Sequence, residues 1–118
     1  MPGDLTGPEA ALRSNGISVE SLSRGDTLAL TYLTAFPGAS VNHQEMGRAC
    51  NTFIELTEEG AWDPVPVEAT VVRAPGDVQG RWRLDPDWIR DLGAYRISEE
   101  EFSARVLDTL EEPAVGEP

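Results

Sequence analysis

The chain contains no lysine. All nine positively charged side chains are arginines, against 21 aspartates and glutamates, and the formal net charge is −12. Lysine is ordinarily among the commonest residues of soluble proteins, so its absence needs a cause. A GC-rich genome favours arginine but does not raise acidic residues to more than twice arginine. A cytoplasm with multimolar salt does both, so the composition predicts a protein of a halophilic archaeon.

The negative charge bears on the possible partners. In ordinary salt, a charge of −12 on a small domain would disfavour nucleic acid and anionic membranes. At about 1 M salt the Debye length falls to roughly 3 Å, so the overall charge no longer steers association. Nucleic acid is therefore an unfavoured partner, but charge does not exclude it.

Several kinds of site and segment are missing from the sequence. The single cysteine, Cys50, excludes an intramolecular disulfide and a cysteine-rich metal site. No glycine-rich phosphate loop, histidine-containing metal cluster or Gly-x-Ser-x-Gly motif is present, so we expect no cofactor. The start, MPGDLTGPEA, lacks a secretory signal, and no apolar run approaches the roughly 20 residues of a membrane helix. We expect a cytoplasmic protein without a membrane partner.

The length of 118 residues predicts a single domain. Proline, glycine and acidic residues gather at both ends of the chain. We therefore expect a flexible tail at residues 1–8, a domain at residues 9–111, and an acidic flexible tail at residues 112–118.

The sequence before the long helix predicts a short helix and at least one strand. Residues 8–14 favour a short helix that stops at Asn15 and Gly16. Residues 17–22 are ambiguous, with a strand-like alternation. Residues 27–36 are apolar on both faces, which indicates a central strand.

A long helix is the clearest element. It begins near Asn42 and ends at Glu59, with Gly60 as its stop. Its apolar residues recur at the spacing of one helix face, which predicts a stripe packed on a sheet. The stripe comprises Met46, Ala49, Cys50, Phe53, Leu56 and Thr57.

Residues 67–73 and 78–84 predict a β-hairpin with a loop at residues 74–77. One register makes one face apolar and places opposite charges across the other, and a slip of one residue destroys both properties. The predicted pairs are Arg73 with Val78, Val71 with Gly80, Ala69 with Trp82, Val67 with Leu84, Thr70 with Arg81, and Glu68 with Arg83.

Two helices follow the hairpin. Asp85 and Pro86 begin the first, which Gly93 closes, and Ser98 with Glu101 forms a capping box for the second. The buried stripe expected for the second helix comprises Phe102, Val106, Leu107 and Leu110. The order β-α-β-β-α-α predicts a two-layer α+β domain, with three or four mostly antiparallel strands and helices on one face.

One group of candidate site residues surrounds the only histidine, His43. It falls in the first turn of the long helix with Glu45 and Arg48 nearby, where the strand ends and the helix begins. His43 could act as a base or a ligand, although a solvated first-turn residue is the simpler interpretation. Cys50 lies two turns further, about 10.5 Å along the axis, which is too far for a Cys–His pair.

A second group lies on the hairpin. Arg73, Arg81 and Arg83 concentrate three of nine cations there, which suggests an anion site or a protein-binding surface. Cross-strand ion pairing is the structural alternative. Trp62, in the linker before the hairpin, could line a cleft, and core packing is its alternative.

Residues 21–110 resemble small acidic haloarchaeal proteins of unknown function. The segments that carry the resemblance are SLSRGDTLALTYLTAFPG, HQEMGRACNTFIEL, TVVRAPGDVQGRW and ISEEEFSARVLDTL. The resemblance implies no activity and assigns no residue a role.

The sequence favours a cytoplasmic, non-catalytic binding or regulatory module that contacts a protein partner or a second copy of itself. One alternative is a small-molecule-binding domain or small enzyme with a site near His43. A DNA-associated regulator ranks last, because Glu99, Glu100 and Glu101 make the last helix acidic.

Overall fold

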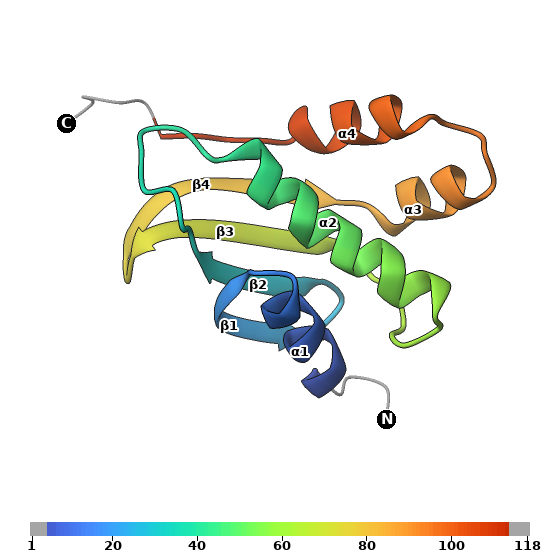
Figure 1. Cartoon of the computed structure of the whole chain (residues 1–118), viewed down its shortest axis with the longest axis horizontal. Helices are drawn as coiled ribbons and strands as arrows, with labels where there is room; N and C mark the ends of the chain where they lie inside the picture. The colour runs from blue at the N-terminus through green and yellow to red at the C-terminus, as the bar shows by residue number, and fades with distance from the viewer. Residues whose placement is uncertain (1–4, 114–118) are drawn as a thin grey trace.

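The computed structural model describes residues 5–113 (Figure 1). Among them, no helix is long and apolar enough to cross a bilayer. The elements are α1 (Thr6–Ser14), β1 (Ser18–Arg24), β2 (Leu28–Leu33), α2 (His43–Glu58), β3 (Val67–Ala74), β4 (Asp77–Leu84), α3 (Pro86–Gly93) and α4 (Glu99–Leu107).

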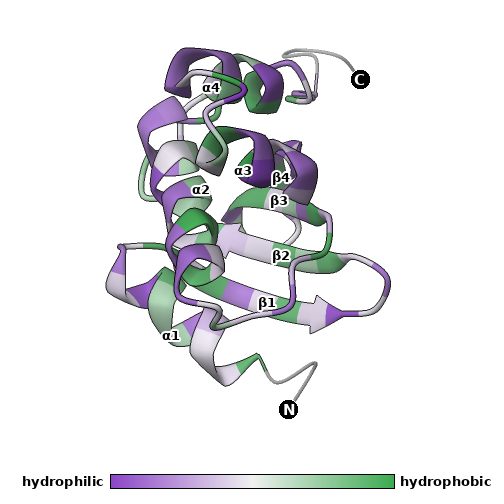
Figure 2. Ribbon diagram, turned by 90° about the vertical axis from the view of Figure 1, so that its right-hand side faces the viewer, coloured by the Kyte–Doolittle hydropathy of each residue, from purple (hydrophilic) through white to green (hydrophobic). Residues whose placement is uncertain are grey.

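The four strands form one sheet in the order β1-β2-β3-β4. The β1–β2 and β3–β4 pairs are antiparallel, whereas β2 and β3 are parallel because α2 crosses between them. The helices lie to one side of the sheet (Figure 2). The predicted α+β class and the central position of β2 are confirmed, and the ambiguous segment before β2 is the edge strand β1.

The core lies between the sheet and α2. The predicted stripe of α2 is buried at Met46, Ala49, Cys50, Phe53 and Leu56. On the facing sheet, the Trp82 indole nitrogen donates to the Tyr32 hydroxyl at 3.1 Å, and the two rings meet edge to face at 6.5 Å. Burial raises the pKa of Tyr32 well above its ordinary value.

The predicted helix starts are confirmed by their caps. The side chains of Asn42, Asp85 and Ser98 accept backbone N–H groups of α2, α3 and α4, and Ser98 forms its capping box with Glu101. The predicted stops of the first two helices are also confirmed, because Gly16 and Gly60 follow α1 and α2 at φ 86° and 65°.

The predicted end of α3 at Gly93 is confirmed, because Gly93 is the last residue of the helix. The left-handed residue that follows is Tyr95, at φ 60°. The Tyr95 amide bonds the Leu92 carbonyl and the Arg96 amide bonds the Asp91 carbonyl at 2.8 Å. This bond pair is the Schellman motif, so tyrosine occupies the position that glycine usually takes.

The hairpin register is confirmed from Val67↔Leu84 to Val71↔Gly80 but not near the turn. The predicted pairing of Arg73 with Val78 is wrong, since Val72 lies opposite Val78 and Ala74 opposite Asp77. A shorter turn at Pro75 and Gly76, with Gly76 at φ 82°, leaves Arg73 and Gln79 unpaired in their strands. Residue spacing does not reveal two compensating bulges.

The ordered elements begin earlier than predicted at the N-terminal end, and contacts hold the C-terminal end. Helix α1 begins at Thr6, two residues before its predicted start. At the other end, the backbone of Glu111 exchanges two hydrogen bonds of 2.8 Å with Arg81, which extends the sheet beyond β4. The Glu112 carboxylate accepts the Val41 amide at 2.7 Å. Of the expected tails, residues 1–4 and 114–118 lie outside the described residues.

Candidate functional site

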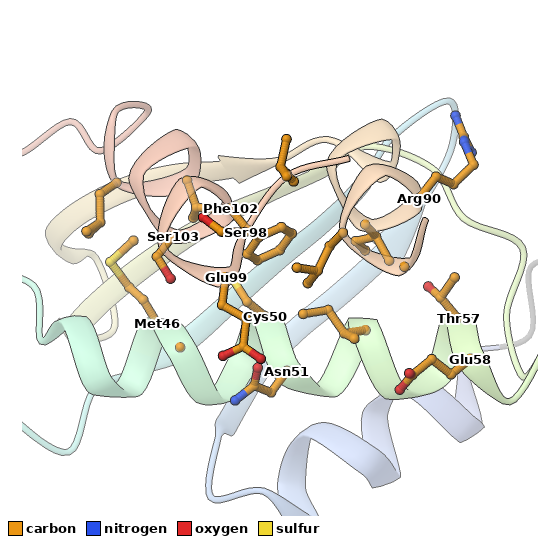
Figure 3. A pocket seen from close by; sticks show the side chains of 18 of the residues that line it. Met46, Cys50, Asn51, Thr57, Glu58, Arg90, Ser98, Glu99, Phe102 and Ser103 are labelled. Carbon is orange, nitrogen blue, oxygen red and sulfur yellow. The ribbon is translucent and has the colours of Figure 1, made fainter. Parts of the chain in front are cut away.

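A groove runs between α2 on one side and α3 and α4 on the other (Figure 3). We call it the helical groove, and its volume is about 960 Å³. The side chains of Met46 and Cys50 on α2 point toward Phe102 on α4, as Figure 3 shows. Its lining is mainly apolar at the base, with Met46, Cys50, Ile54, Ile89, Leu92, Ile97, Phe102 and Val106.

The rim of the helical groove is polar, and its charged residues are Glu58, Glu99 and Arg90. Asn51 and Glu58 contribute from α2, and Glu99 from the first turn of α4. Arg90 also lines the groove, but its guanidinium forms an ion pair with Asp87 of its own helix. The uncompensated rim charge is therefore negative.

Two exposed apolar side chains border the same groove. Leu107 is 37 % exposed and Tyr95 is 94 % exposed, and both line it. Leu107 was expected on the buried stripe of its helix, and that expectation is wrong. In the described part of the chain, Phe36 is the one other large apolar residue that is exposed. Two of these three residues therefore gather at one place.

Tyr95 adopts a conformation that costs free energy. A non-glycine residue in the left-handed region is less stable by about 1–2 kcal/mol, and Tyr95 stands there with its side chain in solvent. Glycine would close α3 without that cost. The side chain gains little from the rest of the domain in return.

Cys50 is part of the groove base and is only 5 % exposed. Burial raises the pKa of its thiol from the ordinary 9.0 to about 12. The thiol therefore stays protonated at neutral pH, and a protonated thiol is a poor nucleophile.

Glu45 has a structural position that the sequence did not indicate. It is 1 % exposed, and its carboxylate accepts the Thr34 hydroxyl at 2.6 Å and the Ala35 amide at 3.0 Å. The carboxylate thus joins the end of β2 to the first turn of α2. The Asn42 side chain accepts the Glu45 amide, whereas the Glu45 carboxylate turns inward to β2.

The structure does not bring His43, Glu45 and Arg48 together. His43 is exposed and lines the helical groove, whereas Glu45 is buried against β2. Arg48 is exposed, and its Nε lies 3.8 Å from where a Cβ on Gly16 would stand. Of the three, His43 alone lines the groove.

The three hairpin arginines differ in their contacts. Arg73 donates to the Gly38 carbonyl at 2.8 Å and to Asp77 at 2.9 Å, so it links β3 to the segment before α2. Arg81 and Arg83 are exposed, and their guanidiniums have no hydrogen-bonding or ion-pair partner among the described residues.

Trp62 packs on α2 outside the groove lining. Its ring lies 5.0 Å from that of Phe53, and its indole nitrogen donates to the Thr57 hydroxyl at 2.8 Å. Trp62 thus covers the C-terminal end of α2.

Sequence reasoning missed Tyr95, Leu107 and the groove itself. The spacing of Leu107 matched the apolar stripe of its helix, and nothing in the sequence marked it as exposed. The signal for Tyr95 was the lack of glycine after Gly93, since the helix stops without one at the left-handed position. The groove depends on how far α2 lies from α3 and α4, which no local pattern encodes.

Comparison with known proteins identifies a family but no function. The family model described as "Domain of unknown function (DUF8159)" matches residues 3–115. No curated protein and no solved structure has significant similarity to the chain. This match confirms that the chain is related to a family of unknown function. Because the match spans nearly the whole chain, the protein belongs to the DUF8159 family.

Proposed function

We propose that the domain is a non-catalytic protein-binding module whose helical groove binds the apolar face of a helix in a partner protein. The observation that carries the proposal is the position of Tyr95, a solvent-exposed aromatic residue held in a strained conformation beside an apolar groove. Tyrosine is enriched among the residues that dominate protein interfaces. A residue kept at a cost to stability suggests a gain elsewhere, here on binding.

The length of the groove favours a helix over a compact small molecule. The lining residues of α2 extend from His43 to Glu58, which is about 22 Å at a rise of 1.5 Å per residue. Apolar side chains recur along both walls at helical spacing, as Met46, Cys50 and Ile54 do on α2. Such walls match the mode in which a helix lays its apolar face into a groove.

The acidic rim specifies the charge of the partner. Glu58 and Glu99 lack an ion pair within 4.0 Å among the described residues, so arginine or lysine beside the apolar face would complement them. The protonated Cys50 thiol in the base favours binding over nucleophilic chemistry. The acidic, lysine-free composition supports a salt-rich cytoplasm as the setting.

A designed peptide can test the proposal without a known partner. The probe is a fluorescein-labelled amphipathic helix of about 15 residues, the length that spans the groove, with leucines on one face and arginines beside them. We expect saturable binding by fluorescence anisotropy at fixed KCl concentration. Tyr95→Gly and Leu107→Ser should each weaken binding at least tenfold.

Phe36→Ser is the matched control, because Phe36 is an exposed aromatic residue that does not line the groove. Its affinity should equal that of the unchanged protein. Equal affinities for all four proteins, or no saturable binding to the unchanged protein, would overturn the proposal. Light scattering on the same samples would show whether a second copy competes for the groove.

A further inference from the structure

The face of the sheet turned away from the helices carries polar and small side chains. Residues on this face alternate with the buried ones: Arg81 and Arg83 flank the buried Trp82, and Glu68 and Thr70 flank the buried Ala69. The observed register places Thr70 opposite Arg81 and Glu68 opposite Arg83. These four side chains therefore form a compact group across β3 and β4.

A hollow of about 320 Å³ lies within this group. We call it the sheet hollow. Thr31 of β2, together with Thr109 and Glu111 of the C-terminal segment, completes its polar lining. It is separate from the helical groove, because the sheet lies between them.

The arginines of the hollow differ from most others in the protein. Six of the nine arginines form an ion pair with a carboxylate within 4.0 Å. Arg81 and Arg83 do not, within the described residues, although Glu68 and Glu111 lie beside them in the sheet. Glu68 instead accepts the Thr27 hydroxyl at 3.4 Å. Within residues 5–113, the N–H donors of both guanidiniums have no partner.

We propose that the sheet hollow binds the oxyanion group of a small molecule, a phosphate or a carboxylate, between Arg81 and Arg83. Residues two apart on one strand face are spaced by roughly 7 Å, so two long guanidinium side chains can converge on one group. Each guanidinium can donate two parallel bonds to an oxyanion. The hydroxyls of Thr31 and Thr70, which have no partner among the described residues, supply further donors at the same hollow.

The carboxylates of the hollow make the proposal specific. Glu68 and Glu111 balance the two arginines, so the hollow has a formal charge of zero. The hollow therefore attracts an anion only weakly over long range. Its affinity for the anion comes from directed hydrogen bonds at short range. Removing a carboxylate should therefore tighten binding, whereas removing an arginine should weaken it.

Titration of the isotope-labelled protein by nuclear magnetic resonance tests this inference. Inorganic phosphate and malonate are separate probes at constant KCl concentration, and they distinguish a phosphate from a carboxylate ligand. We expect saturable shifts of the Arg81 and Arg83 side-chain signals with at least one probe. Arg81→Gln and Arg83→Gln should each weaken binding at least fivefold, and Glu68→Gln should strengthen it about twofold or more.

Arg105→Gln is the matched control, because Arg105 is an exposed arginine paired with Asp91 away from the hollow. This substitution should leave the affinity unchanged. The inference is overturned if the shifts rise without saturation for both probes, or if Arg105→Gln weakens binding as much as Arg81→Gln does. Preserved amide spectra of these surface variants would establish that the fold is intact.

Discussion

Two loops at opposite ends of the molecule differ in how the rest of the chain holds them (Figure 1). Residues 34–42 connect β2 to α2, and residues 94–98 connect α3 to α4. In the first loop, backbone groups are bonded by side chains from distant parts of the chain. In the second, Tyr95 extends into solvent from a strained backbone.

Gln79 shows how the first loop is held. Its amide nitrogen lies 3.0 to 3.1 Å from the carbonyl oxygens of Phe36, Gly38 and Ser40, and the side chain is fully buried. Arg73, Glu45 and Glu112 bond the same loop from other elements. Buried polar groups that bond backbone in this way define one conformation. The comparison teaches that polar side chains near a helix start can be structural, whereas the exposed tyrosine is available for a partner.

The largest expected effect comes from Glu45. Glu45→Ala removes the acceptor of the Thr34 hydroxyl and the Ala35 amide, and the lost bonds should lower the free energy of unfolding by about 3 kcal/mol. Glu45→Gln, which retains an acceptor, should lose less. Denaturant titration at constant KCl measures both. A loss below about 1 kcal/mol for the alanine variant would show that this loop is held no better than the other.

Gly80 tests the same loop by steric means. A Cβ at Gly80 would lie 2.6 Å from Cγ2 of Val41 and 3.0 Å from the Glu111 carbonyl oxygen. Gly80→Ala should therefore destabilise the domain by about 2 kcal/mol. Val41→Ala in the same chain removes one of the two clashes, so the double variant should be more stable than the sum of the single effects predicts. If the effects of the two substitutions on the free energy of unfolding were strictly additive, the close contact between residue 80 and Val41 would be contradicted.

Alkaline pH should destabilise the domain through the groove base. The pKa of Cys50 is about 12 in the folded domain, against an ordinary 9.0. The contribution of the protonated thiol to the free energy of unfolding is therefore fully present below pH 9. It is lost as pH rises toward 12, because the unfolded thiol ionises first, at about 1.4 kcal/mol per pH unit. Tyr32, whose pKa is also raised, adds loss above pH 10. Cys50→Ala should flatten the stability curve between pH 9 and 10, and an unchanged slope would contradict a closed groove base.

Local patterns predicted most of the secondary structure and part of the register. The caps at Asn42, Asp85 and Ser98 were readable because each cap depends on residues within one turn. The pairing of Ala69 with Trp82 followed from alternation, whereas the bulges at Arg73 and Gln79 did not. The two bulges cancel in register because each strand carries one extra residue. Both extra residues bond a loop distant in sequence, and residue spacing carries no record of such contacts.

The candidate site was less predictable than the fold. His43 was singled out by its chemistry and does line the groove, but Glu45 beside it is a buried structural group. Helical spacing places both residues in the first turn of α2. It does not determine which of the two side chains turns toward the end of β2. The groove lies between α2 and α4, and its position depends on tertiary packing, in which Phe102 and Val106 of α4 belong to the core.

The smallest expected effect concerns Tyr95 and has the opposite sign. Tyr95→Gly relieves the left-handed strain and removes a side chain that is 94 % exposed. The change should therefore raise the free energy of unfolding by about 1 kcal/mol. Ala94→Gly, a neighbouring position with φ −90°, is the control and should not stabilise the domain.

The stability of the Tyr95→Gly variant is the most direct test of the claim that Tyr95 is kept for a partner. Denaturant titration at constant KCl should give a variant more stable than the unchanged domain by about 1 kcal/mol. A variant that is less stable would contradict the claim, because the tyrosine ring would then stabilise the domain itself.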